Sequence, residues 1–245
     1  MNKYLKIYKL CLLTAFIATE ICLYLSFMIL QATQGGEYHA IKYSAILVCL
    51  ATSLLLIPCN KTDAIVLSIA FIFTAIADLF IFVLDDRYEV GVTMFIFAQT
   101  AYFARIRFVY GKGLFVSTAL RLTLIAIALT LFNAFEILQP LTALVAVYFI
   151  MLIFNAVESL FLVKTSKQYL LFFFGLLLFI GCDVCVGLNN FSMIGISLSA
   201  EAMEFVGVAM WAFYLPSQVL IALSSRNEAY PPFRKKGATN ETTNG

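Results

Sequence analysis

Seven ionisable side chains lie inside long apolar runs of the sequence, where a charged group is costly and is a functional candidate by default. They are Glu20, Asp78, Arg121, Glu158, Asp183, Glu201 and Glu204. Asp78 and Asp183 have similar surroundings, FIFTAIADLFIFVLDD and LLLFIGCDVCVGLNNF. These residues favour chemistry that carboxyl groups can perform alone. Glu158 and Arg121 are expected to pair with each other.

The sequence carries no other familiar catalytic set. It has no G-x-S-x-G, H-E-x-x-H or P-loop pattern, and its single histidine, His39, lies in a predicted loop. Serine-hydrolase chemistry and a histidine-rich metal centre are therefore disfavoured. Cys182 and Cys185 have C-x-x-C spacing, but without histidines or a second such pair this favours small-residue packing over a metal or redox site. We expect no metal and no cofactor.

The composition places these residues in a membrane. Hydrophobic residues make up 62% of the 245 and charged residues 12%, and the mean hydropathy is +0.95. Soluble domains carry about 25% charged residues. The net charge of +2 is too small to indicate a nucleic-acid partner. The basic start, MNKYLKIYK, precedes an apolar run of about 20 residues, longer than a signal-peptide core, which predicts a retained first helix.

Apolar runs of helical length occur eight times, separated by polar segments such as QGGE, PCNKTD and DDRYE. The predicted spans are residues 10–30, 41–57, 64–84, 90–106, 114–135, 141–163, 169–188 and 200–223. The predicted fold is all-α, an eight-transmembrane-helix bundle over residues 1–224, with about 20 residues in each span. Residues 225–245 are polar and rich in Pro, Gly and Asn, which predicts a disordered tail.

Lysine and arginine are divided unequally between the two sides of such a bundle. One side has the N-terminus, the tail and the loops after the second, fourth and sixth helices, and it holds 14 of them. The other side holds Lys42 and Arg87. Cytoplasmic segments carry the excess of Lys and Arg. Both termini are therefore predicted to be cytoplasmic.

The two aspartates lie at the same predicted depth. Each is 14 residues past the cytoplasmic start of its helix, which is roughly 21 Å into an apolar core of roughly 30 Å. We expect them to line one polar cavity in the outer half of the bundle, with Gln99 and Gln218 nearby. Their separation of 105 residues and their similar flanks indicate a parallel 4+4 helix repeat, in which Gln99 corresponds to Glu204. The alternative is that each Asp is a protonated, structural hydrogen-bonding residue.

Three segments resemble the YhhN family, eight-helix membrane proteins whose members include lysoplasmalogenases. Residues 75–106 resemble the pattern G-D-x-x-L…F-x-x-G-x-x-x-F-x-x-x-H-x-x-Y. Residues 174–191 resemble G-A-L-L-F-x-x-S-D-x-x-L-A-x-N-x-F, and residues 213–225 resemble Y-Y-x-A-Q-x-L-I-A-x-S. Their order and spacing extend the resemblance over nearly the whole chain.

Four positions depart from the family pattern. Ala77 stands for Gly, Cys182 for Ser and Pro216 for Ala, and Gln99 stands where His is usual. A glutamine cannot take or give a proton at neutral pH. If that histidine helps catalysis in relatives, this chain must do without it.

The resemblance implies hydrolysis of the vinyl ether bond of a lysoplasmalogen to a fatty aldehyde and glycerophosphoethanolamine or glycerophosphocholine. Asp78 and Asp183 are the expected catalytic residues, one as a neutral acid and one as a carboxylate, as in paired-acid glycosidases. The expected substrate-binding residues are Gln99, Tyr102, Asn189, Glu204, Tyr214 and Gln218. Two alternatives stay open. One is a proton-coupled transporter or lipid-binding protein, because such proteins also have paired acidic residues near the middle of the membrane. The other is a family member without catalysis.

Overall fold

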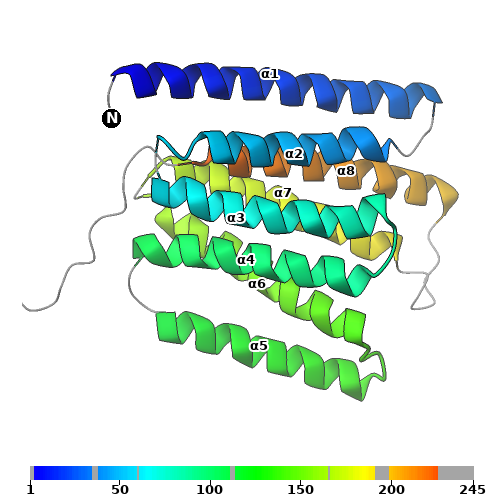
Figure 1. Cartoon of the computed structure of the whole chain (residues 1–245). Coiled ribbons are helices and arrows are strands. Elements are labelled where there is room, and N and C mark those ends of the chain that lie inside the picture. The colour runs from blue at the N-terminus through cyan, green and yellow to red at the C-terminus, as the bar shows by residue number, and fades with distance from the viewer. Residues whose placement is uncertain are drawn as a thin grey trace, which may run out of the picture.

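The computed structural model describes residues 3–34, 38–59, 61–110, 114–164, 166–190 and 199–225. These residues form eight α-helices and one short π-helix, with no strand among them. The helices are α1 (Lys3–Gln34), α2 (His39–Leu55), α3 (Lys61–Asp78), η1 (Leu79–Val83), α4 (Tyr88–Tyr110), α5 (Leu114–Ala134), α6 (Pro140–Leu162), α7 (Gln168–Asn189) and α8 (Ala200–Leu223). The eight α-helices lie roughly parallel to one another, with α6 inclined to the rest, and each runs in the opposite direction to the α-helix before it (Figure 1).

Each predicted helix corresponds to one helix of the structure, with two differences. The first helix begins at Lys3 rather than at residue 10, because a basic turn can be helical when its side chains find partners. Lys9 is buried there and donates to the Ser225 carbonyl at 3.1 Å. The predicted span 64–84 is not one α-helix, since α3 ends at Asp78 and the chain continues as η1.

The surface has the features of a membrane protein. Among the described residues, six helices, counting α3 with η1 as one, are long and apolar enough to cross a bilayer. They are α1, α3 with η1, α5, α6, α7 and α8. Helix α2 is shorter, with 17 residues, and α4 carries Arg105 and Arg107 in its last turns. Large apolar side chains such as Phe115 stand 85% exposed, as side chains in contact with lipid do.

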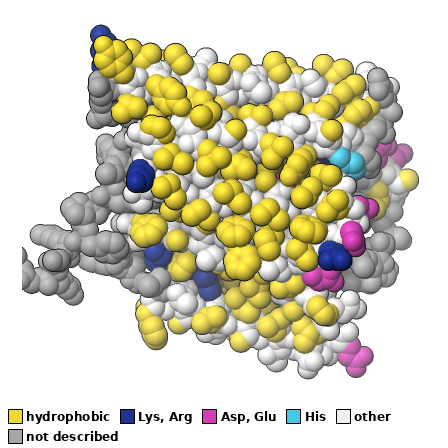
Figure 2. All heavy atoms as spheres, in the orientation of Figure 1, with side chains coloured by type: hydrophobic (Ala, Val, Ile, Leu, Met, Phe, Trp, Pro, Cys, Tyr) yellow, Lys and Arg dark blue, Asp and Glu magenta, His cyan; other side chains and the backbone are white. Residues whose placement is uncertain are grey.

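Charge separates the two ends of the bundle. Figure 2 shows a broad hydrophobic band across the middle, with Lys and Arg mainly at the end where α1 begins and Asp and Glu at the opposite end. We call these the basic end and the acidic end. The described acids at the acidic end are all exposed: Asp85, Asp86, Glu89, Glu136, Glu201 and Glu204. The two basic residues of the described acidic end are Lys42 and Arg87.

Glycines allow the closest helix contacts. A Cβ atom on Gly175 of α7 would lie 3.0 Å from the Ser217 carbonyl of α8. A Cβ atom on Gly91 of α4 would lie 3.2 Å from the Ala77 carbonyl and would overlap the side chain of Ile81. The second contact brings α4 against the turn that carries Asp78.

The predicted tail lies almost wholly outside the described residues. Helix α8 ends at Leu223, and Ser225 is the last residue that the structure describes. The basic residues Lys112, Arg226, Arg234, Lys235 and Lys236, which entered the charge count, also lie outside the described ranges.

Candidate active site

Asp78 is the last residue of α3 and is 1% exposed. Its Oδ2 atom accepts a hydrogen bond of 2.6 Å from the hydroxyl of Tyr214 on α8. Its Oδ1 atom is buried and has no hydrogen-bond partner among the described residues. Buried polar atoms are nearly always paired, so this oxygen has the capacity to accept a further hydrogen bond.

A change of helix type follows Asp78 directly. The Leu84 amide donates to the Leu79 carbonyl at 2.9 Å, which is the wider turn of a π-helix. Single π-turns inside α-helices occur frequently at functional sites. The wider turn alters the direction of the side chains on either side of it, and Asp78 lies at its start.

Asp183 lies on α7 and is half-buried. Its Oδ2 atom accepts a hydrogen bond of 2.7 Å from the hydroxyl of Tyr148 on α6. Each aspartate is therefore held by one buried tyrosine on a different helix. A phenol donor stabilises a carboxylate, and it also fixes the orientation of a neutral carboxylic acid.

Aromatic rings join the two aspartate–tyrosine pairs. The ring centre of Phe179 is 5.4 Å from that of Tyr214 and 6.3 Å from that of Tyr148. Asp78 lies close enough to Tyr148 for an electrostatic interaction. The two carboxyl groups thus belong to one cluster, although they come from helices 105 residues apart. The polar cavity that both were expected to line stays a prediction.

Further buried polar atoms lie one helical turn from the Asp78–Tyr214 pair. Thr74 precedes Asp78 by one turn, and its buried hydroxyl lies within hydrogen-bonding reach of the Tyr102 hydroxyl. The Gln218 Oε1 atom, one turn after Tyr214, is buried without a hydrogen-bond partner among the described residues. Gln218 uses its amide nitrogen to donate to Ser217 at 3.1 Å. Of the expected substrate-binding residues, Tyr102, Tyr214 and Gln218 are buried in this interior.

Gln99 is buried in mid-α4, but its hydrogen bonds with α6 lead away from the aspartates. The amide of Asn155 on α6 donates to Gln99 Oε1 at 3.0 Å. Arg121 then donates to Asn155 Oδ1 at 3.0 Å and pairs with Glu158 at 3.0 Å. The expected pairing of Arg121 with Glu158 is confirmed, and Arg107 joins the same carboxylate.

Two expected substrate-binding residues lie away from the buried cluster. Asn189 is exposed at the end of α7, and Glu204 is exposed near the start of α8. Cys182 and Cys185 are buried and not disulfide-bonded. No group of three or more potential metal ligands occurs among the described residues.

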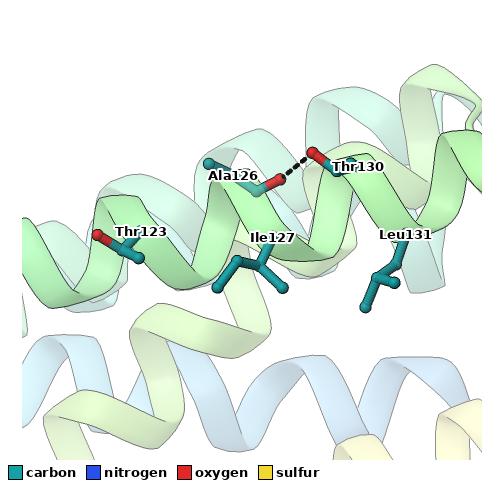
Figure 3. A pocket seen from close by; sticks show the side chains of 5 residues that line it. All are labelled: Thr123, Ala126, Ile127, Thr130 and Leu131. Atoms are coloured by element: carbon teal, nitrogen blue, oxygen red, sulfur yellow. Dashed lines mark hydrogen bonds between the residues drawn. The ribbon is translucent and has the colours of Figure 1, made fainter.

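Two pockets lie on the α5 side of the bundle, and neither is lined by an aspartate. One is a surface groove along α5 itself, where the Thr130 hydroxyl donates to the Ala126 carbonyl (Figure 3). The other has a volume of about 300 Å³ and lies between α4, α5 and α6 beside Arg107 and Glu158. Both are separate from the cluster around Phe179.

A buried ion pair at the basic end was missed in the sequence. Arg105 and Asp63 are both 0% exposed, and the guanidinium donates to both carboxylate oxygens, at 2.8 and 3.0 Å. Arg105 also donates to the hydroxyl and the carbonyl of Ser224, at 2.8 and 2.6 Å. Both charged residues stand near predicted helix ends, where the sequence favours solvent-exposed positions. The sequence feature that could have predicted the pair is the presence of opposite charges near helix ends on the same side of the bundle.

Comparison with known proteins agrees with the resemblance read from the motifs. A family model, that of the YhhN family, matches residues 37–225. No curated protein and no solved structure matches the chain. The matched segment contains both aspartates, both partner tyrosines and all three motif segments. The chain therefore belongs to the YhhN family.

Proposed function

We propose that this protein is a membrane-embedded hydrolase that cleaves the vinyl ether bond of lysoplasmalogens. The observation that carries the proposal is the pair of carboxyl groups, Asp78 and Asp183, each bonded by a tyrosine hydroxyl and joined through Phe179. The chemistry that the family resemblance implies needs two carboxyl groups with different roles. YhhN membership is consistent with a hydrolase of this kind.

In the proposed reaction, a neutral carboxyl group protonates the β-carbon of the vinyl ether, and the double-bond electrons form that C–H bond. The adjacent carbon becomes an oxocarbenium ion, which the second, ionised carboxyl group stabilises. Water adds to this carbon and gives its proton to a carboxylate. The resulting hemiacetal gives its hydroxyl proton to a carboxylate, the C–O bond to the glycerol oxygen breaks, and that oxygen takes a proton from the neutral carboxyl group. This step releases a fatty aldehyde and a glycerophospho-ethanolamine or -choline, and one water molecule is consumed.

The buried polar atoms beside Asp78 suggest roles in binding. Its Oδ1 atom, the Tyr102 hydroxyl and Gln218 Oε1 can hold the attacking water or a glycerol hydroxyl group. Gln99 cannot replace a histidine as an acid or base, so we assign both proton transfers to the aspartates. We assign Glu204 and Asn189 to the entrance at the acidic end, consistent with their exposure.

We further propose that all eight helices cross the membrane, with both termini in the cytoplasm. The alternating direction of the helices (Figure 1) and the separation of charge (Figure 2) support this topology. The 4+4 repeat also gains support. Tyr148, the partner of Asp183, follows Tyr43 by 105 residues, and Tyr43 lies close enough to Asp78 for an electrostatic interaction.

The test is aldehyde release from a lysoplasmenyl-ethanolamine by the purified protein, with the saturated ether analogue as the negative substrate. Turnover of the vinyl ether alone supports the hydrolase over a transporter or a non-catalytic relative. Asp78→Asn and Asp183→Asn should each lower the rate at least about 10²-fold, the usual scale for a positioned acid or base. Glu20→Gln is the matched control, because Glu20 is also a buried carboxyl group but accepts a hydrogen bond from Cys49 on α2 rather than from a tyrosine. Full activity in both Asp→Asn variants would refute the mechanism.

A further inference from the structure

The pocket of about 300 Å³ between α4, α5 and α6 lies at the basic end of the bundle and contains neither aspartate. Most of its lining is apolar. Four of these apolar side chains are also exposed on the surface of the bundle: Val116, Leu120, Val157 and Phe161. Exposed apolar side chains on membrane-spanning helices contact lipid. The pocket therefore opens toward the hydrocarbon of the bilayer, and its walls suit an alkyl chain.

One part of the same pocket is polar. Arg107, Ser117 and Glu158 line it. Arg107 pairs with Glu158, and their side chains are 13% and 15% exposed. Charged groups that face hydrocarbon are costly, and a polar ligand over this part of the pocket lowers that cost. A polar part beside an apolar part matches the head group and the chain of a phospholipid.

Arg121 holds this carboxylate from the interior. It is 4% exposed and donates to both oxygens of Glu158, each at 3.0 Å, and to Asn155. One carboxylate therefore pairs with two guanidinium groups, and Arg107 is the one that lines the pocket. A guanidinium has five N–H donors and can bind several acceptors at once. Arg107 can thus bond to a phosphate group while it keeps its other partners.

The charge of the whole basic end also favours an anion. Lys and Arg gather there (Figure 2), and its described acids are Asp63 and Glu158, each paired with a buried arginine. Lys164 is exposed and follows Phe161 of the pocket by three residues. Basic pockets between membrane helices on the cytoplasmic side bind anionic head groups, and the topology proposed above places this end in the cytoplasm.

We propose that this pocket binds one anionic phospholipid of the surrounding bilayer. Its phosphate bonds to Arg107, and one acyl chain lies along Leu120, Val157 and Phe161. The lipid is bound and not cleaved, because both aspartates lie outside the pocket. The site is therefore separate from that of the proposed hydrolase, and its ligand is a bilayer lipid rather than the substrate.

Binding can be measured by the quenching of tryptophan fluorescence with brominated lipids. Phe161→Trp introduces an indole at the pocket, and the protein without this substitution gives the contribution of Trp211, its only tryptophan. The probes are brominated phosphatidylglycerol and brominated phosphatidylcholine with the same chains, each diluted into mixed micelles. We expect phosphatidylglycerol to be preferred about fivefold at the introduced indole, the value of one cation beside an anionic head group.

Two variants in the Phe161→Trp protein should change this preference in opposite directions. Arg107→Gln removes the cation of the pocket and should abolish the preference. Glu158→Gln removes the anion of the pocket and should increase the preference at least about twofold. Partial unfolding would lower the preference in both variants, so an increase in one of them is specific to the charge of the pocket. Lys61→Gln is the control, because Lys61 is an exposed cation of the same end on α3 and does not line the pocket.

Three results would overturn the proposal. Equal quenching by the two lipids would show that the pocket has no preference for an anionic lipid. Equal loss of preference in Arg107→Gln and Lys61→Gln would assign the attraction to the general charge of the end. Loss of preference on addition of inorganic phosphate, but not of chloride at the same ionic strength, would assign the pocket to a free anion. None of these measurements uses aldehyde release, so they are independent of the proposed hydrolase activity.

Discussion

Breaking the buried Asp63–Arg105 pair should destabilise the protein more than any exposed charge change. Both side chains are 0% exposed, and the guanidinium makes two bonds to Asp63 and two to Ser224. Asp63→Leu leaves a cation buried, and Arg105→Met leaves an anion buried. Removing one partner of a buried pair costs about 3–5 kcal/mol. We expect each single variant to lose this much free energy of unfolding.

The double variant Asp63→Leu/Arg105→Met distinguishes the cost of an unpaired buried charge from the cost of losing the packing of these two side chains. Replacing both charges with apolar groups is often neutral or stabilising, so the double variant should be at least as stable as either single variant. The assay is reversible unfolding in mixed micelles, followed by the fluorescence of Trp211. Asp86→Asn, in the exposed pair with Arg87 at 3.8 Å, is the control and should cause no measurable change. Losses that simply add in the double variant would refute the reasoning.

Three further predictions concern helix contacts, topology and the site. Gly175→Ala should lower the free energy of unfolding by about 1–3 kcal/mol, because the new Cβ lies 2.7 Å from the Ile221 side chain and 3.0 Å from the Ser217 carbonyl. Gly181→Ala, whose Cβ has a Phe213 carbon at 3.4 Å as its nearest atom, should unfold like the unchanged protein. Equal losses in the two variants would contradict this packing. Reporter fusions at Lys61 and Gly245 should report cytoplasm and a fusion at Arg87 the opposite side, and an outside signal at Lys61 would mean that the topology is wrong. Tyr148→Phe and Tyr214→Phe should each slow aldehyde release about tenfold, roughly the value of one hydrogen bond to a charged group, while the rings keep their packing; unchanged rates in both would show that the hydroxyl groups do not orient the carboxyls.

The sequence predicted the helices well because each is a long apolar run bounded by polar residues. The run 200–223 has the bounds of α8, and 141–163 differs from α6 by one residue at each end. The start of α1 was placed too late, since hydropathy treats Lys3, Lys6 and Lys9 as a boundary. Backbone helicity at a charged turn depends instead on contacts such as that of Lys9 with Ser225, which hydropathy does not measure.

The change from α3 to η1 could not be read from the sequence. Residues 64–84 are apolar except for Ser68, Thr74 and Asp78, and an α-turn and a π-turn have the same apolar pattern over so few residues. The difference comes from a neighbouring helix, since Gly91 of α4 packs against Ala77 and Ile81. The two aspartates, in contrast, were predictable as candidates, because an ionisable group in an apolar run is costly wherever its partner lies. Their tyrosine partners lie 136 and 35 residues away along the chain, and no local pattern predicts such contacts.

Lys42 shows what a count of charges along the chain leaves out. In the topology argument Lys42 is one of two basic residues on the side that is assigned outside the cytoplasm, so it counts against that assignment. That argument uses only position along the chain, and it treats Lys42 and Arg87 alike. Packing separates them, since Arg87 is exposed beside Asp86 whereas Lys42 is enclosed by Phe27 and Trp211. A cation enclosed by aromatic faces is stabilised by them, and a count along the chain does not measure this stabilisation, so the two residues that the count treats as equal have different environments in the fold.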